Sequence, residues 1–163
     1  MSTSKDKLSS AQWILERTLG WIAAAEIKVG AITAIDVAML TALGAFFSVE
    51  PSKSPWAIFL GASAAGALLI ALFCTAMVLF PRLKGGPKES LIFFSAITRM
   101  SRADYVMKFE SVSEQDILKD IAAQIHRNAE IAHEKHCWVK KCVGWSLFAV
   151  IPWIATVGLL VKY

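Results

Sequence analysis

Hydrophobic and polar residues are segregated along this chain instead of alternating. Three stretches are apolar over about the 20 residues that a helix needs to cross roughly 30 Å of hydrocarbon. They are residues 29–49, 55–80 and 143–161, and the second has 26 residues without a charge. The pattern therefore predicts an all-α integral membrane protein with three transmembrane helices.

The polar stretches outside these spans are also helical in character. Residues 1–28 form an amphipathic helix that we expect to run unbroken into the first span. Residues 50–54 make a tight external connection between the first two spans. Residues 81–142 form a helical segment between spans two and three, broken at residues 84–87 by the sequence KGGP. The fold class thus includes long helical extensions, which we expect to be cytoplasmic.

Three smaller elements are expected within residues 81–142. Residues 90–97 are apolar but too few to cross a bilayer, so they should pack on protein or on lipid headgroups. Residues 102–110 form a short helix. Ser113 and Asp116 then resemble a capping box that opens a longer helix.

The longer helix carries a stripe at three- and four-residue steps. Its members are Ile117, Ile121, Ile125, Asn128, Ala132 and Lys135. Polar residues on this helix occupy places where a structural core prefers Leu or Ile. Two interpretations stay open, a functional polar face and ordinary packing against the N-terminal helix.

Charge distribution predicts the orientation in the membrane. Lys and Arg number four in residues 1–28, eleven in residues 81–142 and one in residues 50–54. The positive-inside rule then places the N-terminus and residues 81–142 in the cytoplasm and the C-terminus in the periplasm. The first thirty residues lack a signal-peptide pattern, so we expect the N-terminus to be retained. Overall composition agrees, with 56% hydrophobic residues and a mean hydropathy of +0.53.

Several function classes find little support. No GxSxG, HExxH or phosphate-binding loop occurs, so no catalytic residue is predicted and an enzyme is not expected. The three cysteines, Cys74, Cys137 and Cys142, are interpreted as packing residues, because their spacing with nearby histidines matches no standard zinc pattern and no metal is expected. Eleven basic residues against eight acidic ones in residues 81–142 are too balanced for nucleic acid, and anionic lipid headgroups explain the excess better.

Asp36 is an ionisable residue inside the first span. Such a group costs on the order of 2.5–3.5 kcal/mol near mid-bilayer and normally faces a bundle interior or water. One interpretation is a pore-lining or gating role. The other is a hydrogen-bonded Asp that joins helices, with Thr33, Thr41 or Thr75 as partner.

A set of short motifs resembles a known family. They are Trp21-Ile22 followed by Glu26 and Lys28, then Leu91-Ile92-Phe93-Phe94, then Tyr105, then Asp120-Ile121, Gln124-Ile125, Asn128, Ile131-Ala132 and Lys135. Their order and their positions relative to the spans resemble the membrane effector family of the Pycsar antiphage system over residues 15–160. The chain departs from that family's usual pattern at Glu26 and at Asp36.

The resemblance implies a bacterial defence effector of the inner membrane. A partner cyclase would make cyclic CMP or cyclic UMP during phage infection, and this messenger would switch on the effector, which damages or depolarises the membrane and causes abortive infection. No cofactor beyond this activating ligand is implied.

Ligand contacts are predicted from the chemistry of a cyclic nucleotide. Its phosphate needs cationic or amide donors and its base needs an aromatic surface. The candidates are Lys28, Gln124, Asn128 and Lys135 as donors, and Phe93 and Phe94 for stacking.

Assembly is part of the same hypothesis. Three helices enclose no channel wide enough for ions, so a pore would need a homo-oligomer. Two pairs of small residues, Gly61 with Ala65 and Ala62 with Gly66, provide close-packing faces. The alternative function is a small membrane adaptor that assembles partners through its cytoplasmic helices.

Overall fold

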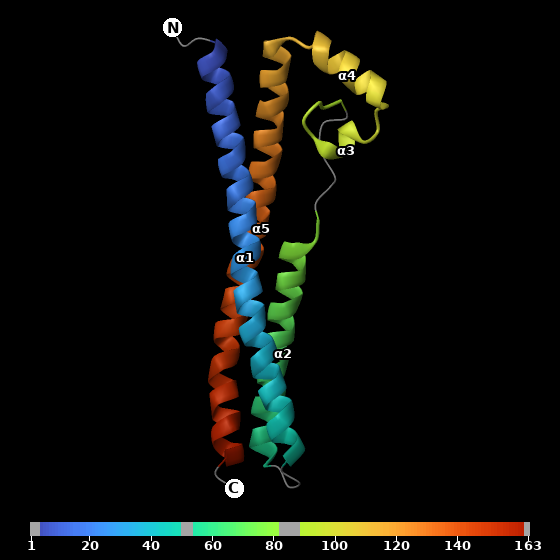
Figure 1. The fold of residues 1–163 in the computed structure, drawn as a ribbon. Helices are drawn as coiled ribbons and strands as arrows, with labels where there is room; N and C mark the ends of the chain where they lie inside the picture. The colour runs from blue at the N-terminus through green and yellow to red at the C-terminus, as the bar shows by residue number, and fades with distance from the viewer. Residues whose placement is uncertain (1–3, 50–53, 82–88, 162–163) are drawn as a thin grey trace. The chain divides into compact units, whose positions relative to one another are not determined.

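The computed structural model describes residues 4–49, 54–81 and 89–161, and these residues are mainly helical (Figure 1). The helices are α1 (Ser4–Val49), α2 (Pro55–Leu79), α3 (Phe94–Ile97), α4 (Arg102–Ser111) and α5 (Glu114–Val161). Helices α1, α2 and α5 are long and apolar enough to cross a membrane. The predictions for the 50–54 connection and for the break at 84–87 fall largely or wholly outside the described residues.

The chain divides into two compact units. Residues 24–80 and 135–163 make the span unit, and residues 1–23 and 81–134 make the extension unit. Helices α1 and α5 each contribute to both units without a break, so the expectation of a helix that continues into the first span is confirmed.

Two hydrophobic clusters hold the span unit together. The first joins Ala25 and Val29 of α1, Cys74 and Val78 of α2, and Cys142 of α5, among others. The second lies further along the helices and contains Leu43, Ala64, Ala67, Leu68 and Ala149. The order of contacts shows that α1 and α5 run in the same direction and that α2 runs opposite to both.

Large apolar side chains also cover the outside of the span unit. Six of them are Ile35, Phe59, Leu69, Phe73, Leu147 and Ile151. Helices that are hydrophobic all round are typical of membrane spans, because lipid tails solvate the outer side chains.

Small residues of α2 serve packing inside the chain. A Cβ added at Gly61 would lie 2.6 Å from the ring of Phe47, so this glycine allows α2 to approach α1. A Cβ added at Gly66 would meet nothing within 4 Å, and Ala62 is exposed. The two predicted small-residue faces therefore differ, because Gly61 packs within the chain and Gly66 borders open space.

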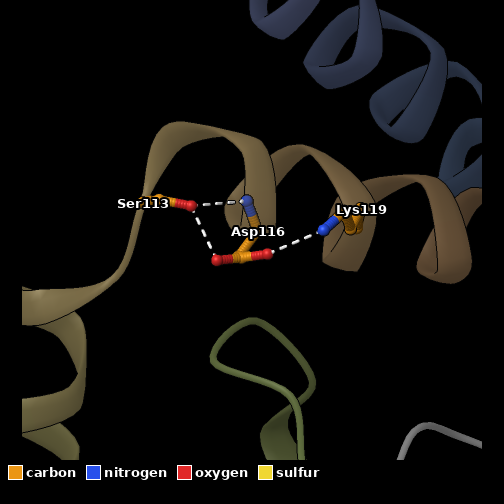
Figure 2. A network of polar contacts seen from close by, with 3 residues as sticks. All are labelled: Ser113, Asp116 and Lys119. Carbon is orange, nitrogen blue, oxygen red and sulfur yellow. Dashed lines mark hydrogen bonds and ion pairs between the residues drawn. The ribbon is translucent and has the colours of Figure 1, made fainter.

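The start of α5 confirms Ser113 as the capping residue of the predicted capping box (Figure 2). The Ser113 Oγ accepts a hydrogen bond from the Asp116 backbone N–H at 3.2 Å and donates one to Asp116 Oδ2 at 2.6 Å. The Lys119 Nζ lies 2.9 Å from Asp116 Oδ1. Ser101 and Asp104 repeat the arrangement at the start of α4. Both caps satisfy N–H groups that the first helical turn leaves free.

The cap makes the start of α5 sensitive to acid. Hydrogen bonds from Ser113 and Lys119, with the charge of Lys119, lower the pKa of Asp116 from its ordinary value of 3.8. A lowered pKa means that the stabilisation is present above pH 3.8 and is lost as the pH falls through the folded-state value.

We therefore expect amide protection in the first turn of α5 to fall as the pH drops below 3.8. Hydrogen exchange, corrected for intrinsic rates, would measure this protection. Asp116→Asn should remove the pH dependence at α5. The start of α4, which is capped by Ser101 and Asp104, should be unaffected by the substitution and serves as the control. Equal protection of this turn of α5 before and after protonation of Asp116 would contradict this expectation.

Candidate functional site

The six predicted ligand contacts are divided between the two units. Phe93, Phe94, Gln124 and Asn128 belong to the extension unit, whereas Lys28 and Lys135 belong to the span unit. These six residues stay a predicted set.

In the extension unit, Gln124 takes part in a buried polar network. The Ser90 Oγ donates to Asp120 Oδ2 at 3.0 Å and accepts from Gln124 Nε2 at 3.4 Å. It also accepts from the backbone N–H groups of Ile92 and Phe93 at 3.1 and 2.8 Å. Ser90 is fully buried and Gln124 is 4% exposed. The network fixes the segment before α3 against α5.

Both backbone groups of Leu91, its N–H and its carbonyl, form hydrogen bonds to side chains. Its N–H donates to Asp120 Oδ2 at 2.8 Å, and its carbonyl accepts from the Tyr105 hydroxyl at 3.2 Å. Two helices, α4 and α5, therefore position the same residue. Sequence analysis did not place Ser90, Tyr105 or Asp120 in a site. One sequence signal pointed to the network: Asp120 and Gln124 are four residues apart, which puts both side chains on one face of the helix.

The predicted stacking residues lie next to this network. The rings of Phe93 and Phe94 are 5.1 Å apart between centroids, at an interplanar angle of 57°. Phe93 is half-buried and Phe94 is exposed, so Phe94 retains a ring face that could contact a planar ligand. Asn128, one helical turn beyond Gln124, is half-buried.

In the span unit, Lys135 of α5 forms an ion pair with Glu26 of α1. The Lys135 side chain is only 5% exposed, whereas that of Glu26 is 41% exposed. Lys28, two residues further along α1, is exposed. The buried ammonium of Lys135 thus depends on the Glu26 carboxylate for compensation of its charge.

Asp36 is fully buried, and Ser146 of α5 donates a 2.9 Å hydrogen bond to its Oδ2. Its Oδ1 is buried and has no hydrogen-bond partner. The carboxyl borders a cavity of about 170 Å³ whose walls come from one stretch of α1 and one of α5: Ile32, Ile35, Asp36, Met39, Val143, Ser146, Leu147 and Val150. Asp36 therefore joins the two parallel spans.

The partner predicted for Asp36 was wrong. Thr33 donates to the Val29 carbonyl and to Thr75, and Thr41 donates to the Val37 carbonyl. The helix register places Ser146 nearest to the carboxyl, which periodicity within one span cannot reveal.

A second set of polar contacts joins α1, α2 and α5. The Thr33 Oγ1 of α1 lies 3.1 Å from the Thr75 Oγ1 of α2, which lies 3.3 Å from the Cys142 Sγ of α5. Asp36, Ser146, Thr33, Thr75 and Cys142 form what we call the polar layer. It links all three spans.

The cysteines differ in their surroundings. Cys74 and Cys142 are buried in the first hydrophobic cluster, as predicted for packing residues. Cys137 is exposed, so the interpretation was wrong for this residue, which lies on the outer side of α5. Within residues 4–49, 54–81 and 89–161, no three His, Cys, Asp or Glu side chains are grouped to hold a metal ion.

Fold and polar contacts together define a class, an all-helical protein with three membrane-compatible helices joined by buried hydrogen bonds. The chain belongs to the Pycsar effector family, since the model of the Pycsar effector protein domain PycTM matches residues 10–162. This membership supports an antiphage defence effector, and the family implies in general terms a cyclic nucleotide signal and a partner cyclase.

Among curated proteins, the chain is similar to the Pycsar effector protein PtPycTM of Propioniciclava tarda. The two are 24% identical over 158 residues, which cover 92% of this chain and 78% of the relative. No solved structure matches the chain significantly.

The polar layer generates a prediction about Ser146. Ser146→Ala removes the donor to Asp36, so we expect it to destabilise the protein in micelles by about 0.6 to 2 kcal/mol, the range for hydrogen bonds between membrane helices. Unfolding in sodium dodecyl sulfate would measure the loss. Thr41→Ala is the matched control, because its exposed hydroxyl bonds only its own helix. Equal losses for the two variants would refute the assignment.

The Glu26–Lys135 pair generates an asymmetric prediction. Glu26→Met leaves the buried Lys135 ammonium without its carboxylate, whereas Lys135→Met leaves a Glu26 side chain that is partly exposed. We expect Glu26→Met to cost about 1–3 kcal/mol more than Lys135→Met in the same unfolding assay. The double substitution should recover most of that difference, and the reverse order of the two single variants would count against the pair.

Proposed function

We propose that this chain is the membrane-killing effector of a Pycsar system. A cyclic pyrimidine mononucleotide, cyclic CMP or cyclic UMP, activates it, and the activated protein depolarises the bacterial inner membrane. The observation that carries the proposal is the extent of the family match, since residues 10–162 include α2, α5 and most of both α1 and the extension unit. One chain thus has a part suited to the membrane and a part suited to receiving a signal.

Activation requires a ligand that favours one state of the protein over another. A messenger shifts such an equilibrium only by its difference in affinity for the two states. Helix α5 provides a physical connection, because it bears Asp120 and Gln124 of the extension-unit network and continues to Ser146 of the polar layer. In this proposal the messenger binds within the extension unit.

Damage to the membrane requires more than one copy. The outer surface of the span unit is apolar, and Gly66 with Ala62 offers a place where a second copy can approach closely. Asp36, buried between α1 and α5, becomes a pore residue if those helices separate during assembly. The N-terminus and the extension unit lie in the cytoplasm in this arrangement and the C-terminus in the periplasm, in keeping with eleven Lys and Arg in residues 81–142.

The test is membrane potential, followed with a voltage-sensitive dye in cells that express this protein with or without a pyrimidine cyclase. We expect depolarisation only when both are present. Gly66→Leu should abolish it by blocking close approach, while leaving expression and helix content unchanged, because the new side chain points into open space.

Two controls define failure. Cyclase alone must leave the potential intact, and Thr41→Ala should behave as the native chain does. Intact potential at confirmed expression, with either nucleotide, would overturn the effector proposal and favour an adaptor. Full activity of Asp36→Leu would remove Asp36 from the mechanism but leave the effector function in place.

A further inference from the structure

The extension unit contains a pocket formed by residues outside the predicted ligand set. Its volume is about 290 Å³, and its described lining consists of Glu89, Leu91, Met100, Lys108, Ser111 and Val112. Ligand pockets in proteins begin at roughly 300 Å³. The pocket therefore lies at the lower end of the sizes at which small molecules bind.

The lining combines two opposite charges with an apolar wall. Lys108 supplies an ammonium and Glu89 a carboxylate, and neither forms an ion pair with another of the described residues. Leu91, Met100 and Val112 are half-buried apolar side chains. An occupant that suits this lining has one anionic group, one N–H donor and a flat face.

A pyrimidine nucleoside cyclic monophosphate has these three features. Its phosphodiester carries a single negative charge, which matches the single cation of Lys108. Cytosine has an exocyclic amine and uracil a ring N–H, and either can donate to the Glu89 carboxylate. The planar base can lie against Leu91 and Met100.

The wall of the pocket is fixed before any ligand arrives. The backbone of Leu91 is bonded to Asp120 on one side and to Tyr105 on the other, and Tyr105 stacks on Phe109 with centroids 5.9 Å apart. A preorganised wall reduces the entropy that binding would otherwise lose. It also connects the pocket to α5 through Asp120.

The geometry points to this pocket as the site at which the chain binds its cyclic pyrimidine mononucleotide, with Lys108 on the phosphate and Glu89 on the base. The assignment rests on the function proposed above and names the site of its messenger. Binding affects how α5 is held in the extension unit, because the ligand contacts Leu91 and the Leu91 N–H is bonded to Asp120 of α5.

The experiment measures binding of cyclic CMP and cyclic UMP to the full chain in detergent by isothermal titration calorimetry. We expect one nucleotide per chain. Lys108→Gln should weaken binding about tenfold or more, the usual effect of losing a charge-assisted hydrogen bond, while Lys108→Arg should retain it within about threefold. Arg102→Gln is the matched control, since Arg102 begins the same helix but does not line the pocket.

A second variant tests the pocket without changing charge. Val112→Phe fills the apolar side and should weaken binding to a similar degree, with circular dichroism and gel filtration showing that the fold persists. Glycerol 3-phosphate serves as a lipid-headgroup probe. Binding of this probe in place of either nucleotide would overturn the assignment.

The same variants, placed in the membrane-potential assay, separate the two proposals. If nucleotide binds the native chain and Lys108→Gln binds equally well, the pocket is overturned and the effector function stands. If binding depends on Lys108 but no cell depolarises, the pocket stands and the effector function fails. If no nucleotide binds the native chain, the pocket is overturned whatever the cells do.

Discussion

Hydrogen bonds inside the bilayer are the constraint on which the span unit depends. Three apolar helices in lipid gain little from hydrophobic contact with one another, because the tails around them are equally apolar. Buried polar groups in the same surroundings must find partners within the protein. The polar layer attaches the helices to one another and gives their buried polar groups partners. Thr33, Thr75 and Cys142 connect all three spans, and Ser146 bonds Asp36 one turn further along. Close packing around Gly61 and two hydrophobic clusters then fix the register.

Two long helices supply residues to both units. Helices α1 and α5 run without interruption through residues of both units. The Glu26–Lys135 pair joins these two helices, and a buried ammonium makes the contact specific to one register.

The extension unit is stabilised differently, by helix caps and by hydrogen bonds that hold the segment before α3. Ser113 and Ser101 begin α5 and α4, and the buried Ser90 hydroxyl gathers four hydrogen bonds that hold the chain before α3. Residues 90–97 are too few and too irregular to form a span, and they pack through Ser90 and Ala96, which are buried. Leu91, which lines the pocket, is bonded through its backbone to both α4 and α5.

The sequence by itself determined the helical class, the three membrane-compatible helices, the capping box at Ser113 and the family, because each depends on local periodicity or on motif order. It also located Asp36 and Lys135 as unusual polar residues. Only the tertiary structure decided that Asp36 meets Ser146, that Lys135 meets Glu26 and that Asp120 holds Leu91. These pairs are separated by 110, 109 and 29 residues. Helix register and rotation choose such partners, and both are set by packing between elements that no single stretch of sequence contains.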